Sequence, residues 1–247
     1  MILRRLGARL KQQDWVAVAI EFAIVAAGVF LGIQASNWND QRKERALEAA
    51  YLVRISHDVR SDISDLNEII RVSEARMGLF NAMLPKASGQ TLPTVFESAR
   101  GRVATEPVPR YDAAKDASPA FTLFILTPLD DNRSAYETMI HTGVIANMGD
   151  IEALRRIEDY YAAVDRENHY ELRLEENRDK FVNAELRVGL SPAKPATVDQ
   201  FTAALAHNPE LLAAAENYWL YTSRHLKLTR DLQAQARGLA DYLDRRN

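Results

Sequence analysis

The sequence predicts an all-α protein, in which an N-terminal transmembrane helix continues into an extramembrane antiparallel helical bundle with an irregular Pro-rich insertion. Three observations predict this class. Residues 16–33 are apolar apart from one acidic residue, the rest of the chain is polar, and long stretches of it lack Gly and Pro while repeating apolar residues at helical spacing. The expected divisions are a basic cytoplasmic tail at 1–14, the transmembrane helix at 15–38 and a helical extracytoplasmic domain at 39–247.

The apolar run is long enough to cross a bilayer. As a helix, residues 16–33 extend about 27 Å at about 1.5 Å per residue, close to the thickness of the hydrocarbon layer. A cleaved signal peptide would have a shorter apolar core without Glu21, and the one suitable cut, after Ala35, has the bulky Ile33 at position −3. A buried helix of a soluble protein is disfavoured because no other segment is apolar enough to enclose it. We therefore expect a retained anchor.

The charges that flank the anchor predict its orientation. Residues 1–14 carry four basic residues and one acidic residue, whereas the far side carries Arg42, Lys43 and Arg45 against Asp40 and Glu44. This small bias favours the N-terminus in the cytoplasm. In a bacterium the expected location is the inner membrane, single-pass, with the C-terminal domain in the periplasm. The lack of Cys fits an oxidising and a reducing compartment equally.

One side of the anchor carries small residues and a carboxylate. Its positions recur every three or four residues and so share a helix face: Ala17, Glu21, Val25, Gly28, Gly32 and Ala35. Gly28 and Gly32 form a G-x-x-x-G pair, which lets a second helix approach closely in lipid. We call these six residues the stripe. It predicts lateral packing against a second copy or a partner membrane protein.

Glu21 leaves three interpretations open. It lies about 9 Å along the helix from Trp15, where a carboxylate needs protonation, hydration or pairing. It packs against a partner helix, it reaches the cytoplasmic headgroups through a thinned interface, or it belongs to a proton or ion pathway, which normally needs further polar groups. Indole and amide side chains suited to the headgroup level form the expected interface belt: Trp15, Gln34, Asn37, Trp38 and Asn39.

Charge excludes one class of partner. The net charge is −3 for the whole chain, and because the tail contributes positive charge, residues 15–247 are more acidic still. Nucleic acid requires a basic face, so no nucleic-acid partner is expected. The expected partners are the lipid bilayer and either further copies of the chain or another membrane protein.

The anchor is expected to continue as a helix beyond the membrane. No Gly or Pro occurs between Gly32 and Gly78, and a heptad pattern runs along this stretch: Val59, Ile63, Leu66, Ile70, Ser73, Met77, Phe80 and Leu84. This pattern is typical of the inner face of an intramolecular bundle or of a dimeric coiled coil. The first is favoured, because further helices with apolar faces follow.

Residues 85–131 form the predicted irregular connector. Six Pro residues interrupt it, with a helix expected at Thr94–Val103. The apolar run at 120–127 is too short to span a bilayer. It is a strand, a buried connector or an exposed patch that contacts membrane or partner, and burial is the default.

Helices are expected again after the connector. The first covers Asn132–Thr142 with Gly143 as its C-terminal cap, and the second covers residues 151–188 with Asp150 as its N-cap. A short helix starts at Thr197 or Asp199. The last one runs from Pro209 to about Leu243 with a second heptad pattern: Leu211, Ala215, Tyr218, Thr222, His225, Thr229, Leu232, Ala236, Leu239 and Leu243.

Two blocks of sequence resemble a known family. Ile20-Glu21, with the segment GIQASNWND at 32–40, is similar to the N-terminal signature of a bacterial family of single-pass membrane proteins classed as a domain of unknown function. The segment SAYETMIHTG at 134–143, with Asn147, Leu154 and Tyr160-Tyr161, resembles that family's second block. Residues 85–131 depart from it. The resemblance implies the topology and a helical outer domain, and it implies no catalytic residues. The matching positions are Glu21, Gln34, Asn37, Trp38 and Asn39, then Tyr136, Glu137, Gly143, Asn147 and Tyr161.

The sequence does not predict an enzyme: no catalytic, cofactor-binding or metal residues are expected. Glu137 with His141, and Asp165 with His169, are each four residues apart and so share helix faces, which makes a metal site in the bundle the remaining enzymatic hypothesis. Such pairs also arise as surface ion pairs. His57 is expected in solvent and His225 in a polar layer of the bundle. The chain has no nucleophile elbow, phosphate loop or zinc signature.

Two functions follow from these patterns. The first is a membrane-anchored, non-enzymatic helical interaction module (a scaffold, accessory subunit or assembly factor) that associates through its transmembrane helix. The alternative is a periplasmic ligand-binding sensor module, since bundles often bind small ligands between helices. The cytoplasmic tail is too short for an output domain, so a sensor would relay its signal laterally to a membrane partner.

Overall fold

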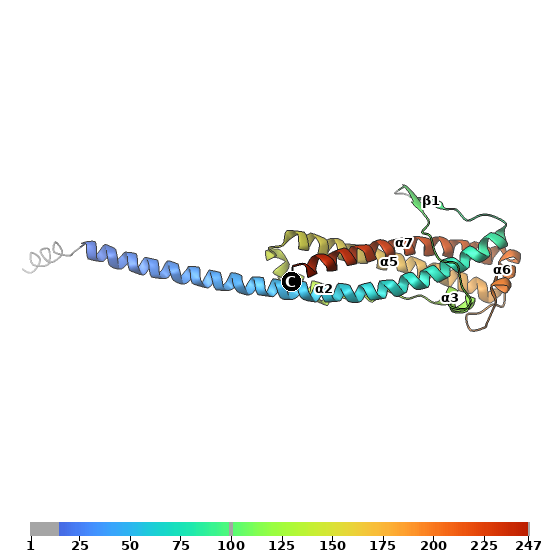
Figure 1. The fold of residues 1–247 in the computed structure, drawn as a ribbon, viewed down its shortest axis with the longest axis horizontal. Coiled ribbons are helices and arrows are strands. Elements are labelled where there is room, and N and C mark those ends of the chain that lie inside the picture. The colour runs from blue at the N-terminus through green and yellow to red at the C-terminus, as the bar shows by residue number, and fades with distance from the viewer. Residues whose placement is uncertain (1–14, 99–100, 247) are drawn as a thin grey trace, which may run out of the picture. The chain divides into compact units, whose positions relative to one another are not determined.

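A computed structural model describes residues 15–98 and 101–246, and the side chains of residues 19–96 and 101–246. Within these ranges the protein is all-α, as predicted, apart from one two-stranded hairpin (Figure 1). The chain divides into two compact units, Met1–Ala50 and Tyr51–Asn247. The predicted basic tail at 1–14, and the side chains of Trp15 and Ala17, lie outside the described part.

The first helix, α2, runs from Trp15 to Ser88. All side chains between residues 19 and 47 are exposed. An 18-residue window in this part has a mean hydropathy of 1.8, and none of the window is buried inside the protein. This is the one helix of the described chain that is long and apolar enough to span a membrane. The interpretation as a buried core helix therefore finds no support, since nothing in the described chain covers it.

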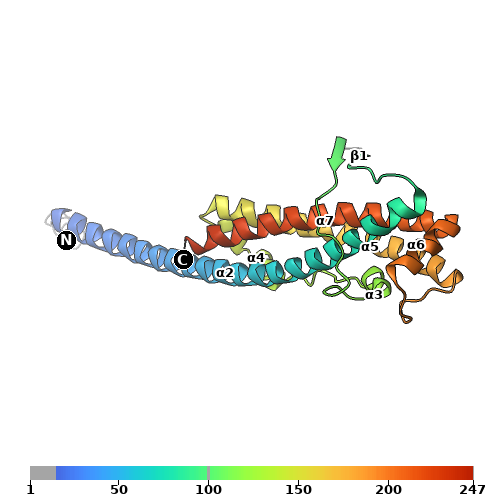
Figure 2. The same ribbon diagram turned by 45° about the vertical axis from the view of Figure 1, so that its right-hand side comes forward.

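The second unit is a bundle of three long helices: α2 from Tyr51 onward, α5 (Ile151–Arg187) and α7 (Pro209–Asp244). One half of its core joins the first turns of α2 in this unit, the start of α5 and the end of α7, around Ile55, Ile157 and Leu239. The other half joins the opposite ends of the same helices. Accordingly α7 runs antiparallel to α2 and α5, whereas α2 and α5 run in the same direction (Figure 2).

Both predicted heptad patterns face the core of this unit. On α2, Ile63 and Ile70 are partly buried and the other six positions are buried. On α7 all ten positions are buried. The ring of Phe80 packs edge-on against Phe181 and Tyr218, with ring centroids 6.1 and 5.5 Å apart. Each such pair contributes about 1 kcal/mol beyond its buried area. The heptads thus mark the inside of an intramolecular bundle.

The largest difference between the predicted and the observed structure lies in the connector between α2 and α4. The helix expected at Thr94–Val103 is wrong, because this segment forms the antiparallel hairpin of β1 (Val95–Ser98) and β2 (Gly101–Ala104). Gly101 has φ +108°, a backbone conformation that residues with a Cβ atom rarely adopt and that the tight turn between the two strands requires. Local strand pairing, with β-branched and aromatic residues such as Val95 and Phe96, overrides the weak helical pattern here.

The apolar run at 120–127 is mostly a short helix, α3 (Pro119–Phe124). Its N-cap is Ser118, whose side chain accepts a hydrogen bond from the amide of Phe121. Ala120 and Leu123 are buried, whereas Phe121 and Phe124 remain exposed. None of the three expected interpretations included a helix, because Pro119 at the first helical position starts one in a stretch too short for periodicity to be read.

The remaining elements agree with the predicted caps. Helix α4 (Ser134–His141) ends before Gly143, which has φ +73° and leads into the 3₁₀ turn η1 (Val144–Asn147). Asp150 caps α5, accepting a hydrogen bond from the Ala153 amide at 3.0 Å. A reciprocal pair of bonds between Thr197 and Gln200 starts α6 (Val198–His207). These caps satisfy helix-end amides that would otherwise lack partners.

The C-terminal turn of α7 closes against α2 near the start of the bundle. The hydroxyl of Ser56 donates a hydrogen bond to Asp244 at 2.9 Å, and Arg60 forms an ion pair with the same carboxylate. Two elements far apart in the sequence are therefore joined by polar contacts at this end of the second unit.

Candidate functional sites

The stripe lies on the exposed, apolar part of α2. Glu21, Val25, Gly28, Gly32 and Ala35 are all exposed, and Ala17 belongs to the same helix. A Cβ atom built at Gly28 or Gly32 would meet no atom of the described residues within 4 Å, apart from the adjoining backbone of its own helix. The notch that the two glycines make is therefore open to a neighbour from outside this chain.

The predicted interface belt is also exposed, at the end of the apolar segment of α2. Gln34, Asn37, Trp38 and Asn39 are exposed, and 67% of the Trp38 surface is accessible. An exposed indole next to amide side chains matches the amphipathic character of a headgroup layer. Trp15, the belt residue at the other end, lies in the helix, and its side chain is outside the described set.

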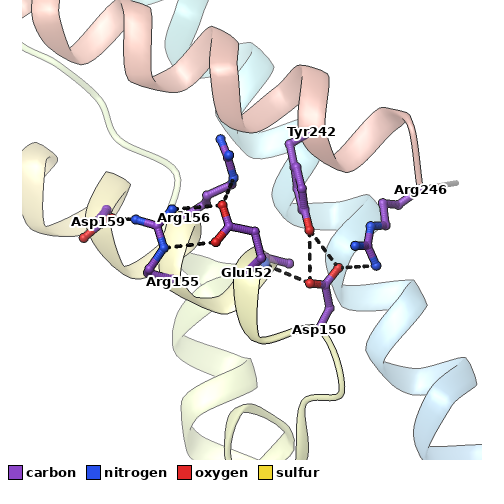
Figure 3. Close-up of polar contacts among 8 residues, drawn as sticks. Asp150, Glu152, Arg155, Arg156, Asp159, Tyr242 and Arg246 are labelled. Carbon is purple, nitrogen blue, oxygen red and sulfur yellow. Dashed lines mark hydrogen bonds and ion pairs between the residues drawn. The ribbon is translucent and has the colours of Figure 1, made fainter.

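A polar cluster joins the start of α5 to the end of α7 (Figure 3). Besides capping α5, Asp150 accepts hydrogen bonds from the Tyr242 hydroxyl at 3.1 and 3.3 Å and forms an ion pair with Arg246 at 2.7 Å. The Tyr242 ring also faces the guanidinium groups of Arg156 and Arg246, at 4.7 and 5.2 Å from its centroid. One carboxylate thus holds two helix ends together.

Replacing Asp150 should separate its two roles. Asp150→Ala removes the N-cap and both contacts to α7, and we expect the free energy of unfolding to fall by about 1–2 kcal/mol. Asp150→Ser retains a capping oxygen and loses the ion pair with Arg246, so its loss should be smaller. Chemical unfolding of the full chain in detergent micelles measures both. Equal losses in the two variants would show that the cap contributes nothing.

A buried polar layer lies in the middle of the bundle. The Nε2 atom of His225 on α7 lies 3.0 Å from the Glu167 carboxylate on α5, and the two side chains are 3% and 1% exposed. The Thr229 hydroxyl donates to the same oxygen of Glu167. The other oxygen of Glu167 and the Nδ1 atom of His225 have no partner. This layer matches the prediction for His225, except that its hydrogen bonds are incomplete.

A buried arginine lies next to this layer. Arg76 on α2 is 1% exposed and its Nη2 donates to the carbonyl of Ile125, but its Nε atom lacks a partner. No ion pair to a carboxylate is found for it among the described residues. Burial lowers its pKa, and the Tyr218 ring faces its guanidinium at 5.3 Å. A buried polar atom left without a partner costs about 1–3 kcal/mol, and the cavity that Arg76 and His225 line has room for a water molecule to partner them.

A small cavity lies between the buried polar layer and Arg76. It lies between α2, α5, α7 and the chain that follows α3, and it has room for about one water molecule. Its polar lining consists of Ser73, Arg76, Thr127, Glu171 and His225. Burial raises the pKa of Glu171, which the charge of His225 and the backbone amide of Leu129 partly offset.

A third polar site fixes the loop before α4. Asp62 of α2 is fully buried and accepts hydrogen bonds from the Asn132 amide at 3.1 Å, from the Asn132 side chain at 3.0 Å and from the Tyr160 hydroxyl at 2.7 Å. Tyr161 donates to the Asn132 carbonyl and stacks on Tyr136 at 4.2 Å. Tyr136 and Tyr161 belong to the block that prompted the family resemblance, and their role here is to hold the loop.

The two acid–histidine pairs do not form a joint site. Asp165 forms an ion pair with Arg133, His141 bonds to the backbone carbonyl of Glu137, and His169 is exposed. In the ranges that the structure describes, no group of three or more His, Cys, Asp or Glu residues could hold a metal ion. His57 is exposed, as expected.

Sequence reasoning missed four buried charged groups: Asp62, Arg76, Glu167 and Glu185. Glu185 is fully buried at the end of α5, and neither of its carboxylate oxygens has a partner. Burial raises the pKa of its carboxyl to about 7. Arg76 lies beside the apolar heptad position Met77, where a charged residue in the sequence is usually taken to face solvent. The burial of these groups depends on the connector and on neighbouring helices, which the sequence pattern does not locate.

Comparison with known proteins yields no relative: no family model, curated protein or solved structure matches this chain. The family resemblance therefore remains a prediction.

Proposed function

We propose that this chain is a membrane-anchored, non-enzymatic helical interaction module, serving as a scaffold, accessory subunit or assembly factor and associating through its transmembrane helix. The observation that carries the proposal is the exposed apolar surface of residues 19–38 on α2. Phe22, Ile24 and Phe30, for example, are 74%, 66% and 61% exposed. Each Å² of apolar surface costs about 25 cal/mol in water, so this surface favours lipid or another apolar helix.

The stripe supports association within the bilayer. Insertion into a bilayer removes the apolar side chains from water whether or not the helix has a notch at Gly28 and Gly32. A second helix, by contrast, packs closely into that notch and gains van der Waals contacts there. Glu21 lies on the same face, where a partner's polar group can satisfy its carboxylate. We propose that the partner is a second copy of this chain or another membrane protein.

The proposed topology is single-pass in the inner membrane, with the bundle in the periplasm. Its support is the excess of Arg and Lys in residues 1–14. A C-terminal fusion to a reporter that is active only in the periplasm should be active. Activity of a cytoplasmic reporter at the same position would reverse the orientation. A mature product that lacks its first three dozen residues would show that the segment is a signal peptide.

The sensor hypothesis receives less support from the bundle. The enclosed space at its polar layer has room for about one water molecule, far less than a small organic ligand requires. The hollow between α5 and α7 that Arg155, Arg156 and Arg166 line has a volume of about 620 Å³ and is an open surface groove. An interaction module needs no internal ligand site, and we therefore favour it.

Filling the notch should abolish association. We expect Gly28→Ile with Gly32→Ile to remove crosslinked oligomers or the co-purifying partner, because two branched side chains hold the helices apart. The chain contains no Cys, so a single Val25→Cys on the stripe provides a clean disulfide crosslink between copies in native membranes. Affinity purification from the same membranes measures capture of a different partner.

The matched control places the same bulk on the other side of the helix. Ala23→Ile with Ala26→Ile adds branched side chains at two exposed positions that face away from the stripe. It should leave both crosslinking and co-purification unchanged. If the glycine variant retains both as well, the stripe is not the interface and the proposal of lateral association is wrong.

A further inference from the structure

The hollow between α5 and α7 on the surface of the second unit is lined by charged residues, and we call it the arginine groove. Its volume is about 620 Å³, and its charged lining consists of Arg155, Arg156 and Arg166 against Asp159. Between residues 155 and 166 the helix α5 advances by about 17 Å, which is about three turns. The groove is therefore a long, open channel and not an enclosed pocket.

Small side chains on both helices open the groove. Ala162 on α5 and Ala234 and Gly238 on α7 line it, and the two alanines are exposed. A Cβ atom built at Gly238 would meet no atom of the described residues within 4 Å, apart from the adjoining backbone of its own helix. The buried residues Tyr160 and Leu239 lie at its base. The groove thus offers an apolar base with space above it for another chain.

Two of the three arginines are held in place by carboxylates. Arg155 forms ion pairs with Glu152 and Asp159, both at 2.9 Å (Figure 3). The Nε atom of Arg156 donates to Glu152 at 2.6 Å, and its guanidinium group faces the ring of Tyr242 on α7. These contacts fix both guanidinium groups before a partner arrives, which lowers the entropy cost of binding.

The groove retains positive charge that its own carboxylates do not neutralise. When Glu152 is counted with the lining residues, three arginines face two carboxylates, so one positive charge is left. Arg166 is exposed, and its side chain has no ion pair or hydrogen bond within the described ranges. The terminal nitrogen atoms of Arg156 also lack an acceptor there. These free donors lie toward opposite ends of the groove, about 15 Å apart along α5.

Free arginine donors above an apolar base fit a segment that carries carboxylates. Guanidinium groups bind carboxylates through paired hydrogen bonds, and this local positive charge lies on a chain whose net charge is −3. An open channel leaves a small molecule largely in solvent, whereas a helix covers its whole length and approaches closely over small residues.

We propose that the arginine groove binds an acidic, helical segment of a partner protein. Carboxylates of that segment lie at Arg156 and Arg166, and its apolar side chains lie over Ala162 and Ala234. The proposal rests on the role of the chain as an interaction module, and it assigns to the bundle a contact that is separate from the anchor.

Binding of a designed peptide to the purified full chain, held in phosphatidylcholine nanodiscs, tests the groove. The probe is a fluorescein-labelled helix of about sixteen residues, with two Glu residues about eleven positions apart and Leu and Ala between them on the same face. We expect fluorescence anisotropy to show saturable binding that weakens as salt rises. The same peptide with Gln in place of both Glu residues should bind at least about tenfold more weakly.

Substitutions in the groove should reduce binding, and matched substitutions elsewhere should not. Arg166→Glu changes an exposed residue with no partner in the described chain, so the fold should survive while affinity falls by about tenfold or more. Arg237→Glu makes the same charge change on α7 at an exposed residue that contacts Asn67 of α2, and it should have little effect. Ala234→Trp fills the groove without a change of charge and should abolish binding, whereas Ala206→Trp, at an exposed position of α6, should not.

Three results would overturn the proposal. The first is the absence of saturable binding by the Glu peptide. The second is an equal loss of affinity in Arg166→Glu and Arg237→Glu, which would show attraction to the overall charge and not to the groove. The third is binding of phosphatidylglycerol vesicles that Arg166→Glu removes, without binding of the peptide, which would assign the groove to lipid headgroups. The paired Gly28 and Gly32 variant should bind the peptide as the parent does, so failure here is distinct from failure of lateral association.

Discussion

Replacing Glu185 with Gln should raise the free energy of unfolding by about 3 kcal/mol at pH 8 and by much less at pH 5. The Glu185 carboxyl is fully buried, its oxygens have no partner, and burial raises its pKa to about 7 from an ordinary value of 4.5. Because the folded state binds this proton more tightly than the unfolded state, the full stability is present below pH 4.5 and is lost as pH rises through 7. Gln is neutral throughout and avoids this loss.

The measurement is chemical unfolding of the full chain in detergent micelles at several pH values. Fluorescence of Trp219 reports on the bundle once Trp15 and Trp38 are replaced by Phe. The informative quantity is the difference between variant and parent, because other carboxylates titrate equally in both. Glu176→Gln, at an exposed position of the same helix, serves as the control and should show no such trend. A difference that does not vary with pH would mean that Glu185 is hydrated in solution.

Replacing Asp62 with Ala should lower the free energy of unfolding by about 3–5 kcal/mol, since it leaves three donors without an acceptor. The donors are the amide and side chain of Asn132 and the hydroxyl of Tyr160, and the Tyr160 hydrogen bond is buried. The loop before α4 is held to α2 through this carboxylate. Hydrogen exchange of residues 130–142 should therefore increase more than that of α5 or α7.

Glu68→Ala is the matched control on the same helix. Its carboxylate also accepts two hydrogen bonds, from Arg71 at 2.6 and 2.8 Å, but both side chains are exposed. Surface pairs of this kind contribute about 0–1 kcal/mol. If Asp62→Ala costs no more than Glu68→Ala, the buried hydrogen bonds do not hold the loop.

The sequence predicts most of the helical framework, for identifiable reasons. Helix ends at Asp150, Thr197 and Gly143 follow from local chemistry, because a cap acts on amides and carbonyls within a few residues. The heptads on α2 and α7 predict which faces are buried. Each of these signals depends only on neighbours in the chain.

The parts that the sequence did not predict depend on contacts between distant segments. Arg76 is buried because the chain after α3 lies over it, and Glu167 pairs with His225 from another helix. The hairpin at 95–104 forms because strands pair with each other, which a single weak helical pattern does not reveal. The six stripe residues share one face of α2 by spacing alone, and whether that face packs against a partner is what the paired glycine variant tests.

The contact of Ser56 and Arg60 with Asp244 has a mechanical consequence. A tensile force that enters the second unit through residue 50 travels along α2 and reaches these two side chains within its first few turns. The final turn of α7 is thus loaded early, whereas the hairpin and α6 at the far end of the bundle bear load late. Truncating the chain before Asp244 would lower the force needed to begin peeling α2 away from its neighbours.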